Sequence, residues 1–163
     1  MKRYYLAYGS NLNQGQMSYR CPGAIPIGIA FLKGYRLLFK GSKTGAFLTI
    51  EPSKKDLVPV GVWLVDETHE RKLDIYEGYP EFYYKVDMPV RMVTLDTCEV
   101  KDINAFVYIM DESRSVGIPS NGYMKVCTDG YRDFGFDESH LIKALMYSQR
   151  LKDRSEQNGT GKC

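Results

Sequence analysis

The sequence predicts a single α+β domain, a curved, barrel-like sheet of antiparallel or mixed strands with two or three helices packed against it. Its 163 residues are 44% hydrophobic, which suffices for one core, and the chain is too short for two ordinary domains. Strand-like segments dominate the first two thirds, and helical signals appear in residues 66–77 and 137–151. We therefore expect one domain over residues 1–151.

Six segments have the composition of β-strands. The first is rich in aromatic residues, and the fourth places Val58, Val60, Val62 and Leu64 at every second position. The last two are expected to pair around the sequence TLDTC. In chain order the predicted strands are residues 3–8, 23–41, 46–52, 58–65, 82–93 and 99–110.

A helix over residues 66–77 interrupts the strands. Asp66 is a suitable N-cap, and Glu67 places a negative charge in the first turn, where the helix dipole favours it. Gly78 followed by Pro80 is a typical helix stop. These signals bound the helix at both ends.

The chain is expected to become helical again after the sequence GIPSNGY. In residues 137–151, Asp137 or Ser139 could cap the start of a helix. Its predicted packing face consists of Leu141, Ile142, Leu145 and Met146. Residues 152–163 contain no apolar side chain except Cys163, so we predict a disordered polar tail there.

Charge and hydropathy argue against several classes of partner. The 22 basic and 20 acidic side chains give a net charge of +2, too small to attract nucleic acid or an anionic membrane. No segment approaches the roughly 18 apolar residues of a membrane span, and the N-terminus lacks the apolar core of a signal peptide. We expect a soluble, unexported protein that acts on a small molecule, and we leave its oligomeric state open.

The cysteines and histidines do not have metal-ligand spacing. The cysteines lack a C-x-x-C pair and the histidines stand alone. These residues are Cys21, Cys98, Cys127, Cys163, His69 and His140. We predict no metal site, and we favour reduced thiols in the cytoplasm, although an even count of cysteines also permits two disulfides.

Glu77 is the most informative single residue, because it places a carboxylate in the last turn of a predicted helix on the same side as Leu73. The negative end of the helix dipole and any burial would both raise its pKa toward the range of a general acid or base. A solvated glutamate that merely ends the helix is the alternative, and spacing alone does not decide between the two.

The turn after the first strand is equally open to two interpretations. Gly9 and Ser10 could present backbone N–H groups to a carboxylate or phosphate, or they could form an ordinary turn. No Walker-type motif is present, and Ser10 lacks the G-x-S-x-G context of a serine hydrolase. The chain has 13 tyrosines, several of them in YEGYPEFYY around Glu77. They could line a pocket for a polar ligand or form an aromatic packing cluster.

The motifs YGSN (residues 8–11) and LDIYEGYP (73–80) together resemble those of the gamma-glutamylcyclotransferase-like superfamily, including its AIG2-like branch. Residues 119–136 resemble the later segment of that family, in which Pro-Ser precedes a Tyr and a helix that leads to a Gly. The resemblance spans most of residues 3–148. It implies a small mixed or antiparallel β-barrel with flanking helices.

The resemblance also implies roles for individual residues. Glu77 is similar to the family's single catalytic acid/base, and Tyr123 to a tyrosine whose hydroxyl faces the same cavity. The implied substrate-binding loop consists of Tyr8, Gly9, Ser10, Asn11 and the adjoining Leu12.

The implied reaction is intramolecular. The α-amine of a gamma-glutamyl compound attacks its own γ-carbonyl and releases 5-oxoproline and a free amine, with one carboxylate acting as base and then as acid. No metal or organic cofactor is required. The leaving group could be an amino acid, a polyamine, a peptide or an isopeptide. The alternative function is a non-catalytic module that binds a small metabolite or a partner's acidic side chain on the same barrel.

Overall fold

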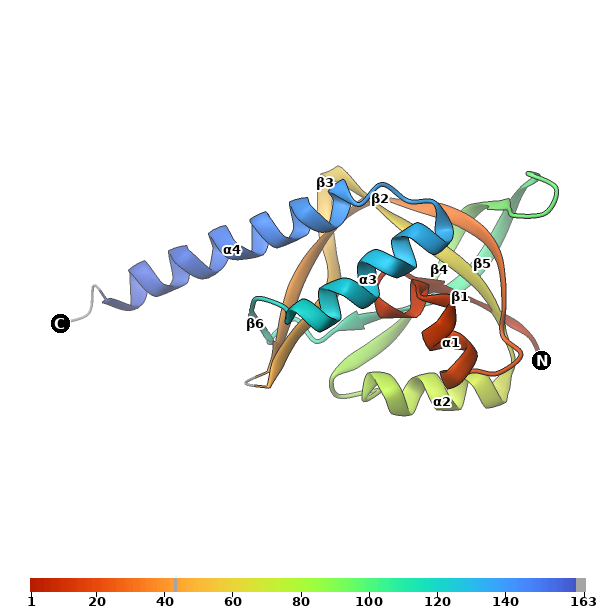
Figure 1. The fold of residues 1–163 in the computed structure, drawn as a ribbon, viewed down its shortest axis with the longest axis horizontal. Coiled ribbons are helices and arrows are strands. Elements are labelled where there is room, and N and C mark those ends of the chain that lie inside the picture. The colour runs from red at the N-terminus through yellow and green to blue at the C-terminus, as the bar shows by residue number, and fades with distance from the viewer. Residues whose placement is uncertain (43, 161–163) are drawn as a thin grey trace.

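The computed structural model describes residues 1–42 and 44–160, and a β-barrel flanked by helices forms its centre (Figure 1). The strands are β1 (Arg3–Ala7), β2 (Ile25–Ser42), β3 (Gly45–Val65), β4 (Tyr83–Thr94), β5 (Val100–Met110) and β6 (Ser115–Val116). The helices are the short 3-10 helix η1 (Ser10–Leu12), α1 (Gln14–Arg20), α2 (Glu67–Glu77), α3 (Asn121–Phe134) and α4 (Ser139–Thr160).

The barrel has five strands and closes because β2 pairs with both β3 and β4. Its strand order is β3-β1-β5-β4-β2, and the short β6 pairs with β2 outside this circuit. The pair β1–β5 is parallel and the other barrel pairs are antiparallel. The predicted α+β class with a mixed barrel and flanking helices is confirmed.

Strand β3 is longer than the sequence predicts. Residues 46–52 and 58–65 were expected as separate strands, but both lie in one continuous strand that pairs with β2 along most of its length. The polar residues between them are largely exposed, so a strand can carry them there without burying a charge. A shift of register between Lys33 and Tyr35 coincides with Gly34, whose φ of 83° suits glycine.

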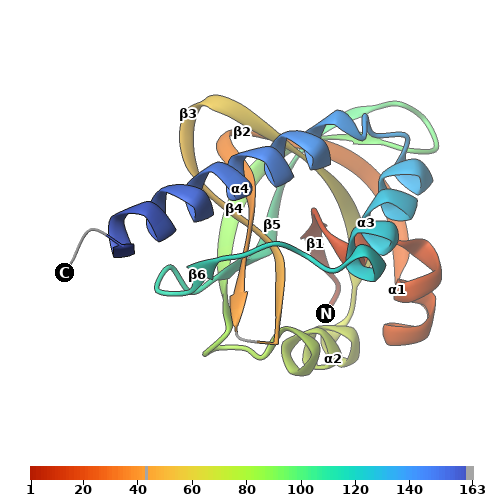
Figure 2. The same ribbon diagram turned by 60° about the vertical axis from the view of Figure 1, so that its left-hand side comes forward.

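Helix α2 has the predicted ends. The Asp66 side chain accepts a hydrogen bond from the His69 backbone N–H, and Gly78 ends the helix in the left-handed conformation with φ of 64°. Leu73 is fully buried and attaches the helix to the core. In both ribbon views α2 lies on the side of the barrel away from α4 (Figures 1 and 2). The bounded helix therefore places Glu77 in its last turn.

The predicted packing face of α4 is only partly correct. Leu141 is buried, but Ile142 and Met146 are 55% and 58% exposed. The buried face continues through Ala144 and Ser148, and the Ser148 hydroxyl accepts a hydrogen bond of 2.8 Å from a backbone N–H of β2. Because α4 contacts mainly one strand, only a narrow stripe of the helix is covered, and the neighbouring apolar side chains face outward.

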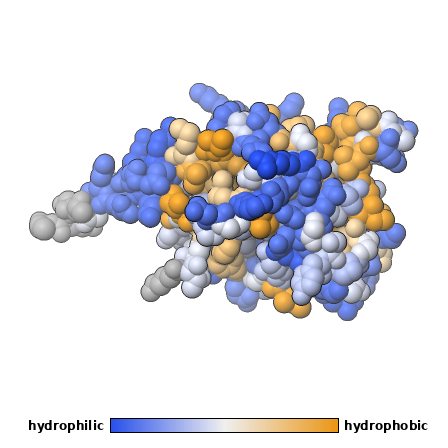
Figure 3. Space-filling view, viewed as in Figure 1, coloured by the Kyte–Doolittle hydropathy of each residue, from blue (hydrophilic) through white to orange (hydrophobic). Residues whose placement is uncertain are grey.

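The end of α4 also differs from the expectation. Residues 152–160, predicted as part of a disordered polar tail, continue the helix, and residues 161–163 lie outside the described part of the chain. A hydrogen bond of 2.8 Å between Gln149 and Asp153 shows how polar side chains support such a helix at i,i+4 spacing. The projecting end is hydrophilic in Figure 3. None of the described helices is both long and apolar enough to cross a membrane.

Candidate functional site

The loop after β1 is tied to the barrel by Tyr8. Its buried hydroxyl donates a hydrogen bond of 2.6 Å to the backbone carbonyl of Tyr108 on β5. The chain then enters η1, where the Leu12 N–H donates to the Gly9 carbonyl at 3.0 Å. The sequence Gly-Ser-Asn thus forms a tight turn, and the hydrogen bond of Tyr8 to the neighbouring strand β5 fixes where that turn begins.

The same turn presents backbone donors. Within the described residues, the N–H groups of Gly9, Ser10 and Asn11 make no hydrogen bond to another group. These three residues line one narrow pocket of about 30 Å³. Free N–H groups at the wall of a pocket are available to an anionic or carbonyl oxygen.

Gly9 allows the loop to pass close to its neighbours. A Cβ atom at this position would lie 3.2 Å from the Tyr123 hydroxyl oxygen and 3.5 Å from Leu48 Cβ. Those distances leave no room for a branched side chain. Close packing against β3 and α3 therefore disfavours a side chain that branches at Cβ.

The structure brings six of the seven sequence-predicted residues into one pocket. The lining contains Tyr8, Gly9, Ser10, Asn11, Glu77 and Tyr123. Leu12 is the exception, since it is fully buried in the core, where it packs beside Gly61 and Gly130. Its place in η1 points its side chain away from the pocket, so its contribution is to packing. The pocket is completed by residues that the sequence did not single out, namely Tyr5, Leu48, Tyr83 and Tyr108.

Glu77 is partly buried, and its carboxyl is at the wall of this pocket. Asn11 Nδ2 donates a hydrogen bond of 3.0 Å to Glu77 Oε1, and the same amide nitrogen lies 2.9 Å from the Tyr5 hydroxyl. Burial raises the pKa of Glu77 to about 7, while the positive charge of Arg20 and the Asn11 hydrogen bond lower it. The direction agrees with the sequence-based expectation, and burial is the largest cause. A carboxyl with this pKa can both accept and donate a proton near neutral pH.

Arg20, at the end of α1, holds the Asn11 side chain in place by a hydrogen bond to its amide oxygen. Its Nη1 donates to Asn11 Oδ1 at 2.6 Å, and its Nη2 donates to the Tyr76 hydroxyl at 2.6 Å. The guanidinium also lies 3.7 Å from the centre of the Tyr76 ring. Neither periodicity nor a motif in the sequence points to these contacts of Arg20, because Arg20, Asn11 and Tyr76 belong to different elements. Arg20 fixes which way the Asn11 amide faces, since its oxygen must accept while its nitrogen donates to Glu77.

Tyrosine side chains form most of the pocket wall. The Tyr83 hydroxyl donates to the Leu48 carbonyl at 2.8 Å, and the Leu48 N–H donates to the Tyr123 hydroxyl at 3.1 Å. Burial raises the pKa of Tyr83 and Tyr123 well above the ordinary value, so both stay protonated and neutral. Neutral aromatic walls explain the high pKa of the neighbouring carboxyl. The pocket-lining interpretation of the tyrosines therefore holds for these residues.

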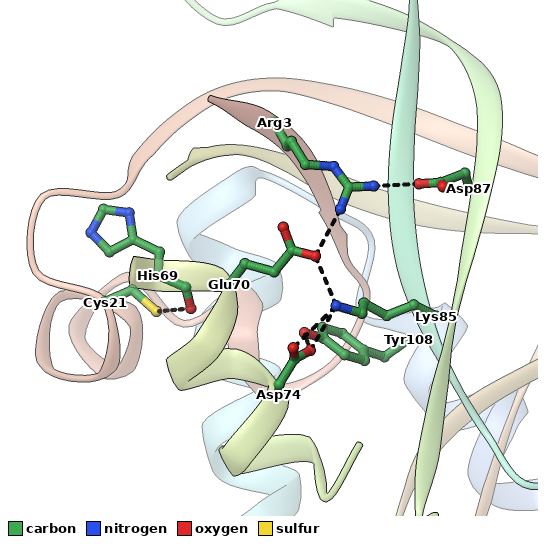
Figure 4. A network of polar contacts seen from close by, with 8 residues as sticks. All are labelled: Arg3, Cys21, His69, Glu70, Asp74, Lys85, Asp87 and Tyr108. Atoms are coloured by element: carbon green, nitrogen blue, oxygen red, sulfur yellow. Dashed lines mark hydrogen bonds and ion pairs between the residues drawn. The ribbon is translucent and has the colours of Figure 1, made fainter. Parts of the chain in front are cut away.

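A polar network holds α2 against the strands behind the pocket (Figure 4). Lys85 Nζ lies 2.7 Å from Glu70 Oε1 and 3.0 Å from Asp74 Oδ1, and Arg3 donates to the same Glu70 oxygen at 2.7 Å. Asp74 also accepts a hydrogen bond of 2.6 Å from the Tyr108 hydroxyl. Because Tyr108 lines the pocket and Asp74 precedes Glu77 by one turn, the network positions the end of the helix relative to the pocket.

A wider groove opens beside the pocket. Its volume is about 400 Å³, and it shares Ser10, Glu77, Tyr83 and Tyr123 with the pocket. The rest of its lining comes from Phe47, Ile75, Tyr76, Gly78 and Phe82. Pocket and groove together form one cavity system whose shared wall carries the carboxyl group.

The cysteines in the described residues are free thiols. Cys21 and Cys127 are buried, whereas Cys98 is exposed in the β4–β5 turn. Cys163 lies outside the described residues. No group of three or more His, Cys, Asp or Glu side chains in the described part of the chain is arranged to hold a metal ion.

Comparison with known proteins agrees with the motifs and the barrel. A family model described as "Gamma-glutamyl cyclotransferase, AIG2-like" matches residues 5–125. The chain is 32% identical to the gamma-glutamylcyclotransferases of Bos taurus and Homo sapiens, over 97% of this chain and 81% of each of those proteins. A solved structure named "Gamma-glutamyl cyclotransferase" superposes with a TM-score of 0.72 at 28% identity, covering 93% of this chain and 87% of that one. The chain belongs to the gamma-glutamyl cyclotransferase, AIG2-like family.

Proposed function

We propose that this protein is a gamma-glutamylcyclotransferase, which converts a gamma-glutamyl amine or amino acid into 5-oxoproline and a free amine. The observation that carries the proposal is the Glu77 carboxyl with a pKa of about 7, which accepts a hydrogen bond from Asn11 and lines the same pocket as Gly9 and Ser10. The family membership and the names of its relatives support the same reaction.

The reaction balances with one proton-transfer group. Ionised Glu77 takes a proton from the α-ammonium of the substrate, and the freed amine attacks the γ-carbonyl to form the new C–N bond of a five-membered ring. Protonated Glu77 then gives that proton to the departing nitrogen as the old C–N bond breaks. The regenerated carboxylate takes the second proton from the ring nitrogen and passes it to the released amine, so the products are the neutral lactam and an ammonium. A pKa of about 7 leaves a large fraction of each form present at neutral pH, as both steps require.

The turn and its neighbours supply the remaining groups. The N–H groups of Gly9, Ser10 and Asn11 are suited to hold the substrate α-carboxylate or the oxyanion that develops on the γ-carbonyl. The neutral Tyr123 hydroxyl lies beside Gly9 and reaches the same space. Binding in this cavity would fold the substrate so that its amine and carbonyl meet, which supplies much of the rate advantage by proximity. The reaction as written uses no metal or organic cofactor.

The cellular setting is part of the same proposal. The free thiols among the described residues support a reducing, cytoplasmic location. The net charge of +2 favours a small-molecule substrate over nucleic acid.

The test is to incubate the purified protein with a panel of gamma-glutamyl compounds and measure 5-oxoproline by mass spectrometry. Glu77→Gln should lower turnover by roughly 10² or more, because it preserves the shape but cannot transfer a proton. Glu67→Gln is the matched control, since Glu67 is an exposed glutamate at the other end of α2. Its turnover should equal that of the unmodified protein.

Two outcomes would contradict the proposal. Full turnover in Glu77→Gln would assign the proton transfers to another group, with Tyr123 or a bound water as the next candidates. Inactivity toward every compound, together with ligand binding that is unchanged in Glu77→Gln, would instead favour the non-catalytic binding module.

A further inference from the structure

The groove beside Glu77 is continuous with the pocket at the atoms where the proposed reaction occurs. The two cavities share Ser10, Glu77, Tyr83 and Tyr123, and the groove is much the larger, at about 400 Å³ against about 30 Å³. The narrow pocket is too small to hold a whole gamma-glutamyl compound. A substrate must therefore occupy both cavities.

The chemistry of the two cavities assigns the two ends of the substrate. The pocket offers backbone N–H groups of the turn, which suit the carboxylate of the glutamyl head. The departing nitrogen must lie within reach of Glu77 to receive its proton, and the groove begins at that residue. The part of the substrate attached to this nitrogen therefore extends into the groove.

The groove walls are mainly apolar. Phe47, Phe82 and Ile75 line it together with the Tyr76 ring, and the Phe47 and Phe82 rings contact each other edge to face at 6.4 Å between centres. Glu77 is the only lining residue with a carboxylate, and the lining includes no lysine, arginine or histidine among the described residues. The Ile75 side chain is 83% exposed, so it adds an uncovered apolar surface at the rim.

We infer that this groove receives the leaving group and selects gamma-glutamyl compounds whose amine part carries an aromatic or branched aliphatic side chain. The inference rests on the proposed function and adds the class of leaving group to it. An apolar side chain is removed from water against Phe47, Phe82 and Ile75, whose side chains offer a charged group no partner. The Arg114 and Arg20 guanidinium groups pack on the Phe82 and Tyr76 rings but are not among the residues that line the groove. An acidic side chain would in addition lie near the Glu77 carboxylate.

The first experiment compares substrates that differ only in the side chain of the leaving amino acid. The initial rates of 5-oxoproline release from gamma-glutamylphenylalanine, gamma-glutamylleucine and gamma-glutamylaspartate give kcat/KM for each. We expect about tenfold or more in favour of the two apolar substrates over the acidic one, as for other apolar specificity pockets. Equal values, or a preference for the acidic substrate, would overturn the inference while leaving the proposed function intact.

The second experiment changes the groove at its most exposed residue. Ile75→Lys removes an apolar wall and adds a positive charge, and the high exposure of Ile75 means that folding should survive. The preference for phenylalanine over aspartate should shrink by about fivefold or more, mainly through KM. Ile142→Lys is the control, because Ile142 is also an exposed isoleucine but lies on α4, outside the groove.

The outcomes distinguish a failure of the leaving-group inference from a failure of the proposed function. An unchanged preference in Ile75→Lys, or an equal change in Ile142→Lys, would overturn the groove as the leaving-group site. Absence of 5-oxoproline with every substrate would refute the proposed function and the inference with it.

Discussion

The Glu77 carboxyl is subject to two opposing influences, and both come from identified neighbours. Burial raises its pKa, while the Arg20 charge and the Asn11 hydrogen bond lower it. Arg20 acts in two ways, because its charge reaches Glu77 and its hydrogen bond to Asn11 Oδ1 orients the amide that contacts the carboxyl. Arg20 is therefore expected to be a positioning residue for the proposed acid/base.

Replacing Arg20 by Gln should raise the pKa of Glu77 further, because the largest lowering influence is lost. Since Glu77 must be ionised to accept the first proton, the acid limb of kcat/KM should move to higher pH. Arg20→Lys should keep the limb near its original position but lower kcat roughly tenfold, because an ammonium cannot reproduce the forked contacts to Asn11 and Tyr76.

A pH–rate profile of each variant measures both effects. Arg71→Gln provides the control, since it removes an exposed arginine from α2 and should leave the profile unchanged. If the acid limb of Arg20→Gln coincides with that of the unmodified protein, Arg20 does not influence the ionisation of Glu77.

The ionisation of Glu77 should also affect stability. Its pKa is about 7 in the folded protein against 4.5 for the ordinary side chain, so the folded state favours the protonated form. The preference of the folded state for protonated Glu77 adds to the free energy of unfolding. This stabilisation is fully present below pH 4.5 and is lost as the pH rises through 7, and the loss amounts to about 3 kcal/mol. Glu77→Gln is neutral at every pH and should gain stability relative to the unmodified protein between pH 5 and pH 8.

Urea unfolding at these two pH values tests the expectation, with Glu67→Gln as the control because its carboxylate is exposed. The expectation would be wrong if Glu77→Gln and the unmodified protein differed in stability by the same amount at both pH values.

Among the structural elements, α2 and the turn after β1 place the reacting groups. The Asp66 cap and the Gly78 stop determine where α2 begins and ends, and thus which residue occupies the last turn facing the pocket. The turn after β1 depends on close packing, since its glycine contacts Tyr123 and Leu48. Each element has a short local signal, but the cavity exists only where the two meet.

Gly9→Val should abolish turnover or raise KM strongly. The added branches would collide with the Tyr123 hydroxyl and Leu48, which lie 3.2 and 3.5 Å from the position of a Cβ atom, and would displace the N–H groups of the turn. Ser10→Ala should cost less, because it leaves the backbone donors in place. Steady-state kinetics measure the difference.

The control for the turn is Gly122→Ala, because a Cβ atom there would lie 4.0 Å from the Ser120 hydroxyl oxygen, an ordinary contact. Circular dichroism should show that every variant is folded. A Gly9→Val protein with normal kinetics would exclude the turn as the site of substrate binding.

At the scale of the whole molecule, closure of the barrel brings distant parts of the chain together. Asn11 and Glu77 are 66 positions apart and Tyr8 and Tyr108 are 100 apart, yet each pair is hydrogen-bonded. The far end of α4 takes no part in this arrangement, since Ser148 is the last buried residue among those of the helix whose burial is described and the helix projects beyond the barrel (Figure 1).

Deletion of the residues after Leu151 should therefore leave activity unchanged and shift Tm by no more than about 2 °C, because residues 152–159, the part whose burial is described, include no buried side chain. Circular dichroism should record a small loss of helix, as residues 152–160 are helical in the structure. A fall in Tm of many degrees would show that this segment contributes to the folded core. A drop in activity at unchanged Tm would place it near the substrate.

Much of the site could be predicted because its signals are local. The cap at Asp66, the stop at Gly78 and the position of Glu77 between them follow from hydrogen bonds within one helical turn, and the YGSN turn is recognisable as a motif. The six strand segments predicted from composition and periodicity fall in the five barrel strands, with β3 divided in two, and the expected barrel-like sheet of antiparallel or mixed strands is a mixed one. Such features depend on interactions between residues close together in the chain, and these can be read directly from the sequence.

What the sequence by itself determined, then, is the barrel strands apart from the division of β3, helix α2 with the acid at its end, and the turn after β1. The tertiary structure decided which tyrosines surround that acid, that Arg20 orients Asn11, that Leu12 belongs to the core, and that an apolar groove opens beside the carboxyl. The physical reason is that each of these depends on contacts between elements far apart in the chain. Such contacts exist only after β2 has paired with both β3 and β4 and the barrel has closed.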